Sequence, residues 1–148
     1  MNSYTIAHII HLYCAISFVG GVIFEALILS ALHSPAVSRD SRREVERAIS
    51  RRAVRVMPFI VAGVFLSGLA MVHRYAAVLL NPFDSAFGLQ LWLKIALAFS
   101  IFIHFLIAVS KMRRQTLTVA WSKYIHAAVL IQMLAIVFLA KSMFYLNF

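Results

Sequence analysis

Apolar residues follow one another in four long blocks, which short polar or charged stretches separate. The blocks cover about residues 5–32, 54–73, 88–110 and 120–145. Each is close to the roughly 20 residues that an α-helix needs to cross a membrane. The blocks lack the two-residue alternation of strands, and a helix satisfies its own backbone polar groups in lipid. The pattern therefore predicts an all-α integral membrane protein, a bundle of four transmembrane helices.

The connections between the blocks carry weaker signals. Residues 38–55 are rich in arginine and predict a solvated helical stretch that leads into the second span. Residues 74–87 contain the turn sequence Asn81-Pro82-Phe83-Asp84 and predict a loop. The sequence shows no internal repeat, low-complexity tract or sign of a second domain. Residues 1–148 are therefore predicted to form a single four-helix transmembrane domain.

Composition agrees with a membrane protein and narrows its chemistry. The chain is 63% hydrophobic, with a mean hydropathy of +0.89, which is unlike a soluble domain. Cys14 is the single cysteine. A disulfide framework and a cysteine-based metal site are therefore excluded.

The net charge of +9 is concentrated in two of the connections. The cations between the first and second spans are Arg39, Arg42, Arg43, Arg47, Arg51, Arg52 and Arg55, and those between the third and fourth are Lys111, Arg113, Arg114 and Lys123. The positive-inside rule places both connections in the cytoplasm and both termini on the outer, periplasmic side of a bacterial inner membrane. The charge thus predicts orientation and contact with membrane lipids, and no nucleic-acid partner.

Polar residues inside the spans sort by depth into two levels. At 1.5 Å per residue, His11 lies about 10 Å and His8 about 15 Å outward of the centre of the first span. Lys94 and His73 reach the same outer level from the third and second spans. The inner level holds His104, His126 and Glu25. Such groups are rare in lipid-facing helices, so they are candidates for a functional site.

The first span concentrates this chemistry on one face. His11, Cys14, Phe18, Gly21 and Glu25 follow one another at helical spacing. The glycine lowers the bulk beside this stripe, which would allow a flat macrocycle or a neighbouring helix to approach.

Histidines on facing membrane helices, with no thiolates and few carboxylates, favour a b-type haem. At the outer level Arg74 and Lys94 are candidate partners for its propionates; Arg55 and Lys123 are candidates at the inner level. A histidine-based copper or zinc site remains open, with His11, His73, His104 and His126 as its ligands. A proton pathway through the histidines and Glu25 is a third alternative, and pure packing of the histidines is a fourth.

Three short motifs resemble known membrane families. The first span reads His11-Leu-Tyr-Cys-Ala-Ile-Ser-Phe18-Val-Gly20-Gly21, similar to the opening of CopD-like proteins and of HemJ-type protoporphyrinogen oxidases, where a tryptophan usually stands at the position of Phe18. The stretch Trp92-Leu93-Lys94, with His104 further on, is similar to their third helix. The second span resembles theirs in its basic residue, proline and glycine, which are Arg55, Pro58 and Gly68 here.

The resemblance implies a four-helix bundle that binds haem b or a porphyrin, with His11 and Lys94 at the matching functional positions. The arginine that HemJ-type proteins carry after the glycines is absent, and Glu25 stands nearby. An outer segment rich in methionine and histidine, which would capture copper, is also absent from the sequence.

We therefore expect a membrane protein that holds one or two haem b groups and acts in electron transfer or a haem- or porphyrin-linked redox step, with a redox protein or quinone as partner. His11 is the expected axial ligand, with His73, His8 or Lys94 opposite or beside it, and His104 and His126 form the expected inner pair. A HemJ-like oxidoreductase activity is the enzymatic form of this hypothesis. The alternatives are CopD-like transport of copper or another metal ion, and a cofactor-free assembly subunit. The small residues Gly63 and Ser67 leave a homodimer open.

Overall fold

The computed structural model describes residues 2–145, without the side chains of residues 143 and 144, and this part of the chain contains helices and no strand. Four helical segments are long and apolar enough to cross a membrane, namely Ser3–His33, Arg39–Leu80, Ala86–Arg113 and Val119–Ser142. Each of them overlaps one of the four predicted spans, although the second is much longer than the predicted 54–73. The prediction of an all-α integral membrane protein is therefore confirmed.

The helices begin where the sequence offers capping side chains. The side chain of Asn2 accepts a hydrogen bond at the start of α1 (Ser3–Ile23), Ser38 does so for α2 (Arg39–Val72), and Ser85 for α4 (Ala86–Arg113). α4 ends just before Gln115, which adopts a positive φ of 56°. The last helix, α5, covers Val119–Tyr145.

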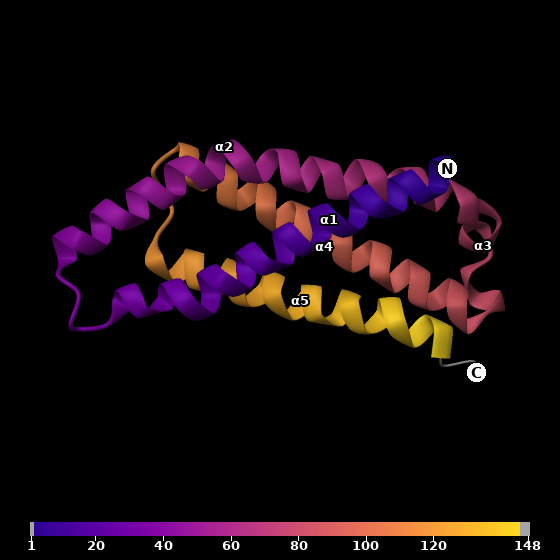
Figure 1. Ribbon diagram of the computed structural model, residues 1–148. Helices are drawn as coiled ribbons and strands as arrows, with labels where there is room; N and C mark the ends of the chain where they lie inside the picture. Colours follow the sequence, from indigo (N-terminus) through magenta and orange to yellow (C-terminus); the bar gives the residue numbers. More distant parts are fainter. Residues whose placement is uncertain (1, 146–148) are drawn as a thin grey trace.

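The helices form a closed ring of neighbours. α1 packs mainly on α2, and α4 mainly on α5; α1 also contacts α5, and α2 contacts α4. Both described ends of the chain lie at one end of the bundle, together with the connection between α2 and α4 (Figure 1). The other two loops lie at the opposite end, where the α1–α2 hairpin extends beyond the α4–α5 loop (Figure 1).

The structure departs from the sequence pattern in two places, at the end of the first predicted span and in the predicted loop at residues 74–87. α1 continues through a π-helical turn, η1 (Phe24–Ile28), and a 3₁₀ turn, η2 (Leu29–His33). The predicted loop after α2 contains η3 (His73–Tyr75), the short helix α3 (Ala76–Leu80) and η4 (Pro82–Asp84). The predicted helical stretch at residues 38–55 is confirmed, since α2 runs through it without interruption.

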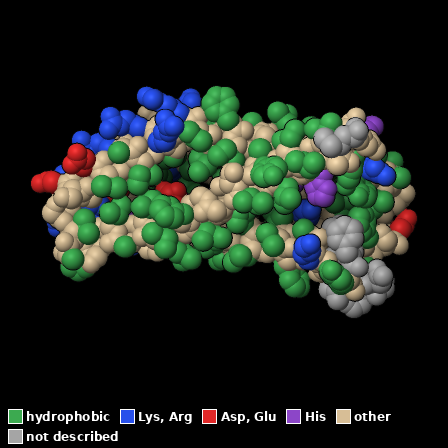
Figure 2. All heavy atoms as spheres, in the orientation of Figure 1, with side chains coloured by type: hydrophobic (Ala, Val, Ile, Leu, Met, Phe, Trp, Pro, Cys, Tyr) green, Lys and Arg blue, Asp and Glu red, His purple; other side chains and the backbone are tan. Residues whose placement is uncertain are grey.

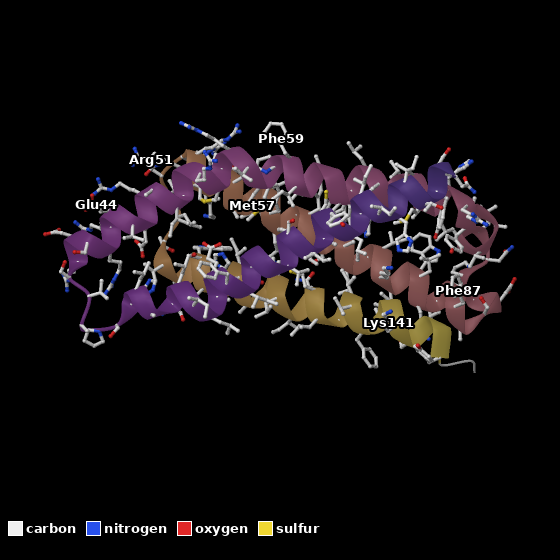
Figure 3. All side chains as sticks on the ribbon, viewed as in Figure 1. Glu44, Arg51, Met57, Phe59, Phe87 and Lys141 are labelled. Atoms are coloured by element: carbon white, nitrogen blue, oxygen red, sulfur yellow. The ribbon has the colours of Figure 1, made fainter. Side chains whose placement is uncertain are left out.

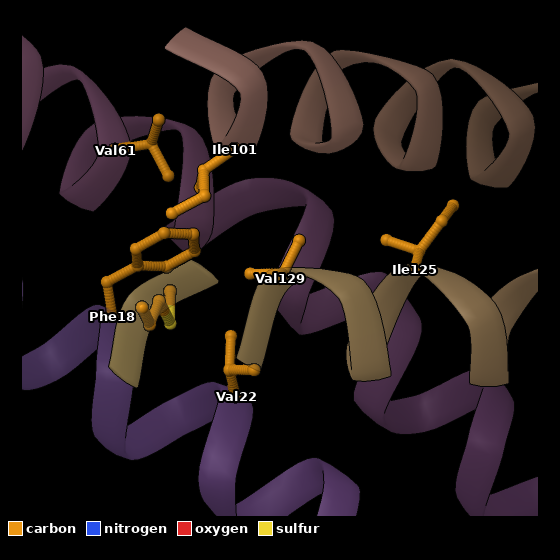
Figure 4. Close-up of a cluster of buried hydrophobic side chains, with 7 residues drawn as sticks. Phe18, Val22, Val61, Ile101, Ile125 and Val129 are labelled. Carbon is orange, nitrogen blue, oxygen red and sulfur yellow. The ribbon is translucent and has the colours of Figure 1, made fainter. Parts of the chain in front are cut away.

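The buried core is a small cluster of apolar side chains (Figure 4). It consists of Phe18, Val22, Val61, Ile101, Ile125, Val129 and Met133, from all four long helices. Many large apolar side chains face outward instead, and they cover the middle of the molecule (Figure 2). A large exposed apolar surface on a small chain indicates contact with lipid.

Candidate functional site

His11 contacts α2 from α1. Its Nδ1 lies 3.0 Å from the backbone carbonyl oxygen of Val64 and 3.2 Å from Oγ of Ser67. A carbonyl oxygen only accepts hydrogen bonds, so Nδ1 of His11 carries the proton and donates it. Nε2 then keeps its lone pair, and no hydrogen bond to Nε2 forms among residues 2–145. This is the tautomer in which histidine ligates a metal through Nε2.

Small residues of α2 allow this contact. Gly68 faces the His11 ring, because a Cβ added at Gly68 would lie 3.4 Å from Cε1 of the imidazole. One turn along α1, Cys14 fills the space above Gly63, where an added Cβ would lie 2.6 Å from Sγ. Ser67 is buried and donates its own hydroxyl hydrogen to carbonyl groups of α2, which leaves its oxygen free to accept from His11.

Two more residues of the predicted outer level lie near His11. The Lys94 ammonium and the His8 ring are both within electrostatic range of the His11 imidazole. Lys94 is half-buried on α4, and no carboxylate in the described part of the chain forms an ion pair with it. His8 is exposed and stacks obliquely near Tyr4, with ring centroids 6.1 Å apart. Figure 2 shows a histidine beside a basic side chain in the half of this face that lies toward the N terminus.

His73 and Arg74 lie further out, at the end of α2. They line a recess of about 380 Å³ together with Ser3, Tyr4, Ala7 and Ala70. The Arg74 guanidinium lies over the Tyr4 ring, 4.9 Å from its centre, and the Tyr4 hydroxyl is 3.4 Å from that of Tyr75. The recess therefore joins the start of α1 to the end of α2 and presents a cation and an imidazole at its wall.

At the inner level His126 pairs with Glu25 across two helices. Nε2 of His126 lies 3.0 Å from Oε2 of Glu25, and its Nδ1 lies 2.7 Å from the carbonyl oxygen of Ser122. Since Nδ1 donates to the carbonyl, a second proton must lie between Nε2 and the carboxylate; otherwise two lone pairs would face each other. Glu25 reaches this position from the π-helical turn η1.

His104, the other predicted inner residue, makes a local contact. Its Nδ1 lies 2.8 Å from the carbonyl oxygen of Ser100, one turn earlier on α4. Its ring lies 6.1 Å from the Tyr124 ring on α5. No hydrogen bond joins the His104 ring to the His126 ring; each is hydrogen-bonded to other residues.

The structure shows two polar features that the sequence pattern does not predict. Val64 offers a backbone oxygen to His11, and no sequence pattern marks that atom. Gln132 on α5 donates to the carbonyl oxygen of Ala128 and leaves its buried Oε1 without a partner in the described structure. Across residues 2–145, no three side chains of His, Cys, Asp or Glu gather as a metal-binding group would.

Comparison with protein-family models, with curated proteins and with solved structures finds no match for this chain. The resemblance to CopD-like and HemJ-type proteins therefore stays a prediction.

Proposed function

We propose that the chain is a bacterial inner-membrane protein that binds haem b at His11 and uses it in electron transfer or a haem-linked redox step. The observation that carries the proposal is the His11 imidazole, fixed by Val64 and Ser67 so that Nε2 is left with a free lone pair. Haem iron binds neutral imidazole nitrogen, and a hydrogen bond from the other ring nitrogen orients such a ligand.

The charges near His11 support an anionic cofactor. Lys94 is half-buried in a span and has no carboxylate partner among the described residues. A cation within a membrane helix is costly unless an anion or water accompanies it. The propionates of a haem would supply that anion, with Arg74 as a second cation nearer the membrane surface. His73 and His8 are the candidates for the second axial position. Lys94 would be a third only as the neutral amine, in which case Arg74 alone would pair with a propionate.

We restrict the proposal to one haem at the outer level. His126 already shares its Nε2 with Glu25, so a second haem on His104 and His126 would require that pair to open. The expected inner haem therefore stays a prediction without support from the geometry. If the protein is an enzyme, the HemJ-type resemblance implies that it oxidises a porphyrin. A quinone or a redox protein would exchange electrons with the haem.

The test is a reduced-minus-oxidised absorbance spectrum, with a pyridine haemochrome assay, on protein purified from haem-replete cells. We expect a b-type spectrum and about one haem per chain. His11→Ala should lower the haem content by at least about tenfold, since even loss of a residue that only orients a ligand weakens metal binding about 10- to 100-fold. His33→Ala is the matched control, because His33 is exposed and faces Glu46 far from this site.

Ser67→Ala separates ligation from positioning. It keeps the His11 imidazole and the Val64 carbonyl but removes one of the two acceptors of Nδ1. We expect haem to remain bound with weaker affinity, measured by haem titration of the apoprotein. A colourless wild-type protein, or equal haem in wild type and His11→Ala, would overturn the proposal.

Transport of copper or another metal ion is the alternative function. It predicts metal retention in elemental analysis of the purified protein, lost in His11→Ala or His104→Ala, and no haem absorbance. A cofactor-free assembly subunit predicts neither, and only mild effects from every histidine substitution.

A further inference from the structure

A hollow lined by arginines lies on α2 where this helix leaves the apolar part of the bundle. It has a volume of about 310 Å³, and its walls are Ala48, Arg51, Arg52 and Arg55. The four residues follow one another at helical spacing on one face of α2, so the small side chain of Ala48 leaves space beside the longer arginines. Figure 2 shows basic side chains gathered over this half of α2.

The hollow lies at the level of lipid headgroups. α2 has 34 residues, which makes it about 51 Å long at 1.5 Å per residue, against about 30 Å for the hydrocarbon core of a bilayer. The apolar part of α2 begins at Val56, the residue after Arg55. The three arginines therefore occupy the two turns next to the hydrocarbon, where phosphate groups lie.

Below the hollow the same face of α2 is apolar and exposed. Phe59 and Leu66 follow Arg55 at helical spacing, and Phe59 is 80% exposed. Phe59 projects from α2 away from the other helices, and Arg51 lies nearer the α1–α2 loop (Figure 3). A headgroup over the arginines would thus have its acyl chains beside Phe59 and Leu66.

The arginines have no carboxylate partners of their own. The ion pairs of the described chain join His33 to Glu46 and His126 to Glu25, and neither involves an arginine. Glu44 lies on the same helix but forms no ion pair with Arg51, Arg52 or Arg55. Nε of Arg51 donates to the carbonyl oxygen of Arg47, which holds that side chain along the helix.

We propose that this hollow is a binding site for the phosphate of an anionic membrane lipid, held by Arg52 and Arg55 with Arg51 at its edge. Arginine presents several N–H donors in a planar fork and suits phosphate better than lysine does. A phosphodiester lipid such as phosphatidylglycerol fits both the cationic hollow and the apolar face beneath it. The site is independent of the haem proposal, because none of its residues belongs to the His11 cluster.

The experiment is native mass spectrometry of the detergent-purified full chain with added phosphatidylglycerol or phosphatidylcholine. We expect retention of phosphatidylglycerol well above phosphatidylcholine. The double variant Arg52→Gln, Arg55→Gln should weaken that retention about 25-fold, since each basic side chain near an anionic surface contributes about fivefold. Arg39→Gln, Arg43→Gln is the matched control: it removes the same charge from the same helix, farther from the hydrocarbon, and should change retention less than about twofold.

Three results would overturn the proposal. Equal losses in both double variants would mean a diffuse attraction without a site, and equal retention of the two lipids would mean that the phosphate charge is not recognised. Displacement of the lipid by millimolar inorganic phosphate would assign the hollow to a soluble anion. Circular dichroism checks that each variant stays helical, and if the double variant unfolds, Arg55→Gln alone should still lower retention about fivefold.

Discussion

At the scale of single residues, the histidines differ in what fixes their tautomer. His104 and His126 donate from Nδ1 to a carbonyl oxygen one turn earlier on their own helix, a contact that any helical histidine can make. His11 donates to a carbonyl oxygen of a different helix. The prediction that His11, His8 and Lys94 share a level in the membrane follows from helical rise alone. Sequence spacing could not indicate that Val64 would meet His11, since that depends on how α1 and α2 pack.

Glu25 and His126 give a prediction about stability. Glu25→Ala removes the carboxyl group that shares a proton with Nε2 of His126. It should lower the free energy of unfolding by about 1 kcal/mol, which is the size of an interhelical polar contact in a membrane protein. The effect is modest because the Glu25 side chain is 43% exposed. Glu25→Gln should retain most of the stability, since its amide can donate to Nε2. Denaturation of the protein in detergent micelles, followed by circular dichroism, measures both.

The control for this pair is Glu44→Ala, which removes a carboxylate that is exposed and forms no ion pair. It should leave the unfolding transition of the protein where it is. If Glu25→Ala also left that transition unchanged, the contact between η1 and α5 would contribute nothing to the fold.

At the scale of elements, the α1–α2 interface shows both the strength and the limit of sequence pattern. The pattern identified both spans and the small residues Gly63 and Ser67, but it left open whether these face a neighbouring helix or a second copy of the chain. In the structure Gly63 meets Cys14 and Ser67 meets His11, so both are used within one chain. A homodimer, which stays a prediction, would have to use another face. The π-helical turn η1 was not predicted either, because the apolar sequence around Glu25 is equally compatible with a regular α-helix.

Gly63→Ala tests this interface. The added methyl would lie 2.6 Å from Sγ of Cys14, so either the Cys14 side chain must rotate away or α1 and α2 must move apart. We expect a loss of about 1–3 kcal/mol in the free energy of unfolding, as is usual when a packed interior is overfilled. Gly20→Ala is the control, because nothing lies within 4 Å of its added Cβ. Thermal unfolding in detergent compares the two.

A second substitution in the Gly63→Ala background distinguishes local overlap from a general effect on the helix. Cys14→Ala removes the sulfur that the new methyl would meet and should restore most of the lost stability. If Gly63→Ala were as stable as Gly20→Ala, or if Cys14→Ala gave no rescue, the close approach of α1 and α2 at this point would be wrong.

At the scale of the whole molecule, charge and topology together predict orientation. The α1–α2 and α4–α5 loops lie at one end of the bundle and the described chain ends at the other (Figure 1). The two loops and the flanking helix ends carry most of the cations. The positive-inside rule predicts that this end is cytoplasmic and that the termini and α3 are periplasmic. The same orientation would place His11 and Lys94 nearer the periplasm and the arginine hollow of α2 at the cytoplasmic leaflet, where anionic lipid is attracted by basic residues.

Cysteine labelling in intact cells tests this orientation. In a Cys14→Ala background, Phe83→Cys places a thiol in the connection between α2 and α4, where the native side chain is 86% exposed. Pro35→Cys places one in the exposed α1–α2 loop. A membrane-impermeant maleimide should label the first in intact cells and the second only after the inner membrane is made permeable. The reverse pattern would mean that the bundle has the opposite orientation, because helices connect the two loops. The His11 cluster would then lie on the cytoplasmic side, and a haem there would exchange electrons with partners in the cytoplasm.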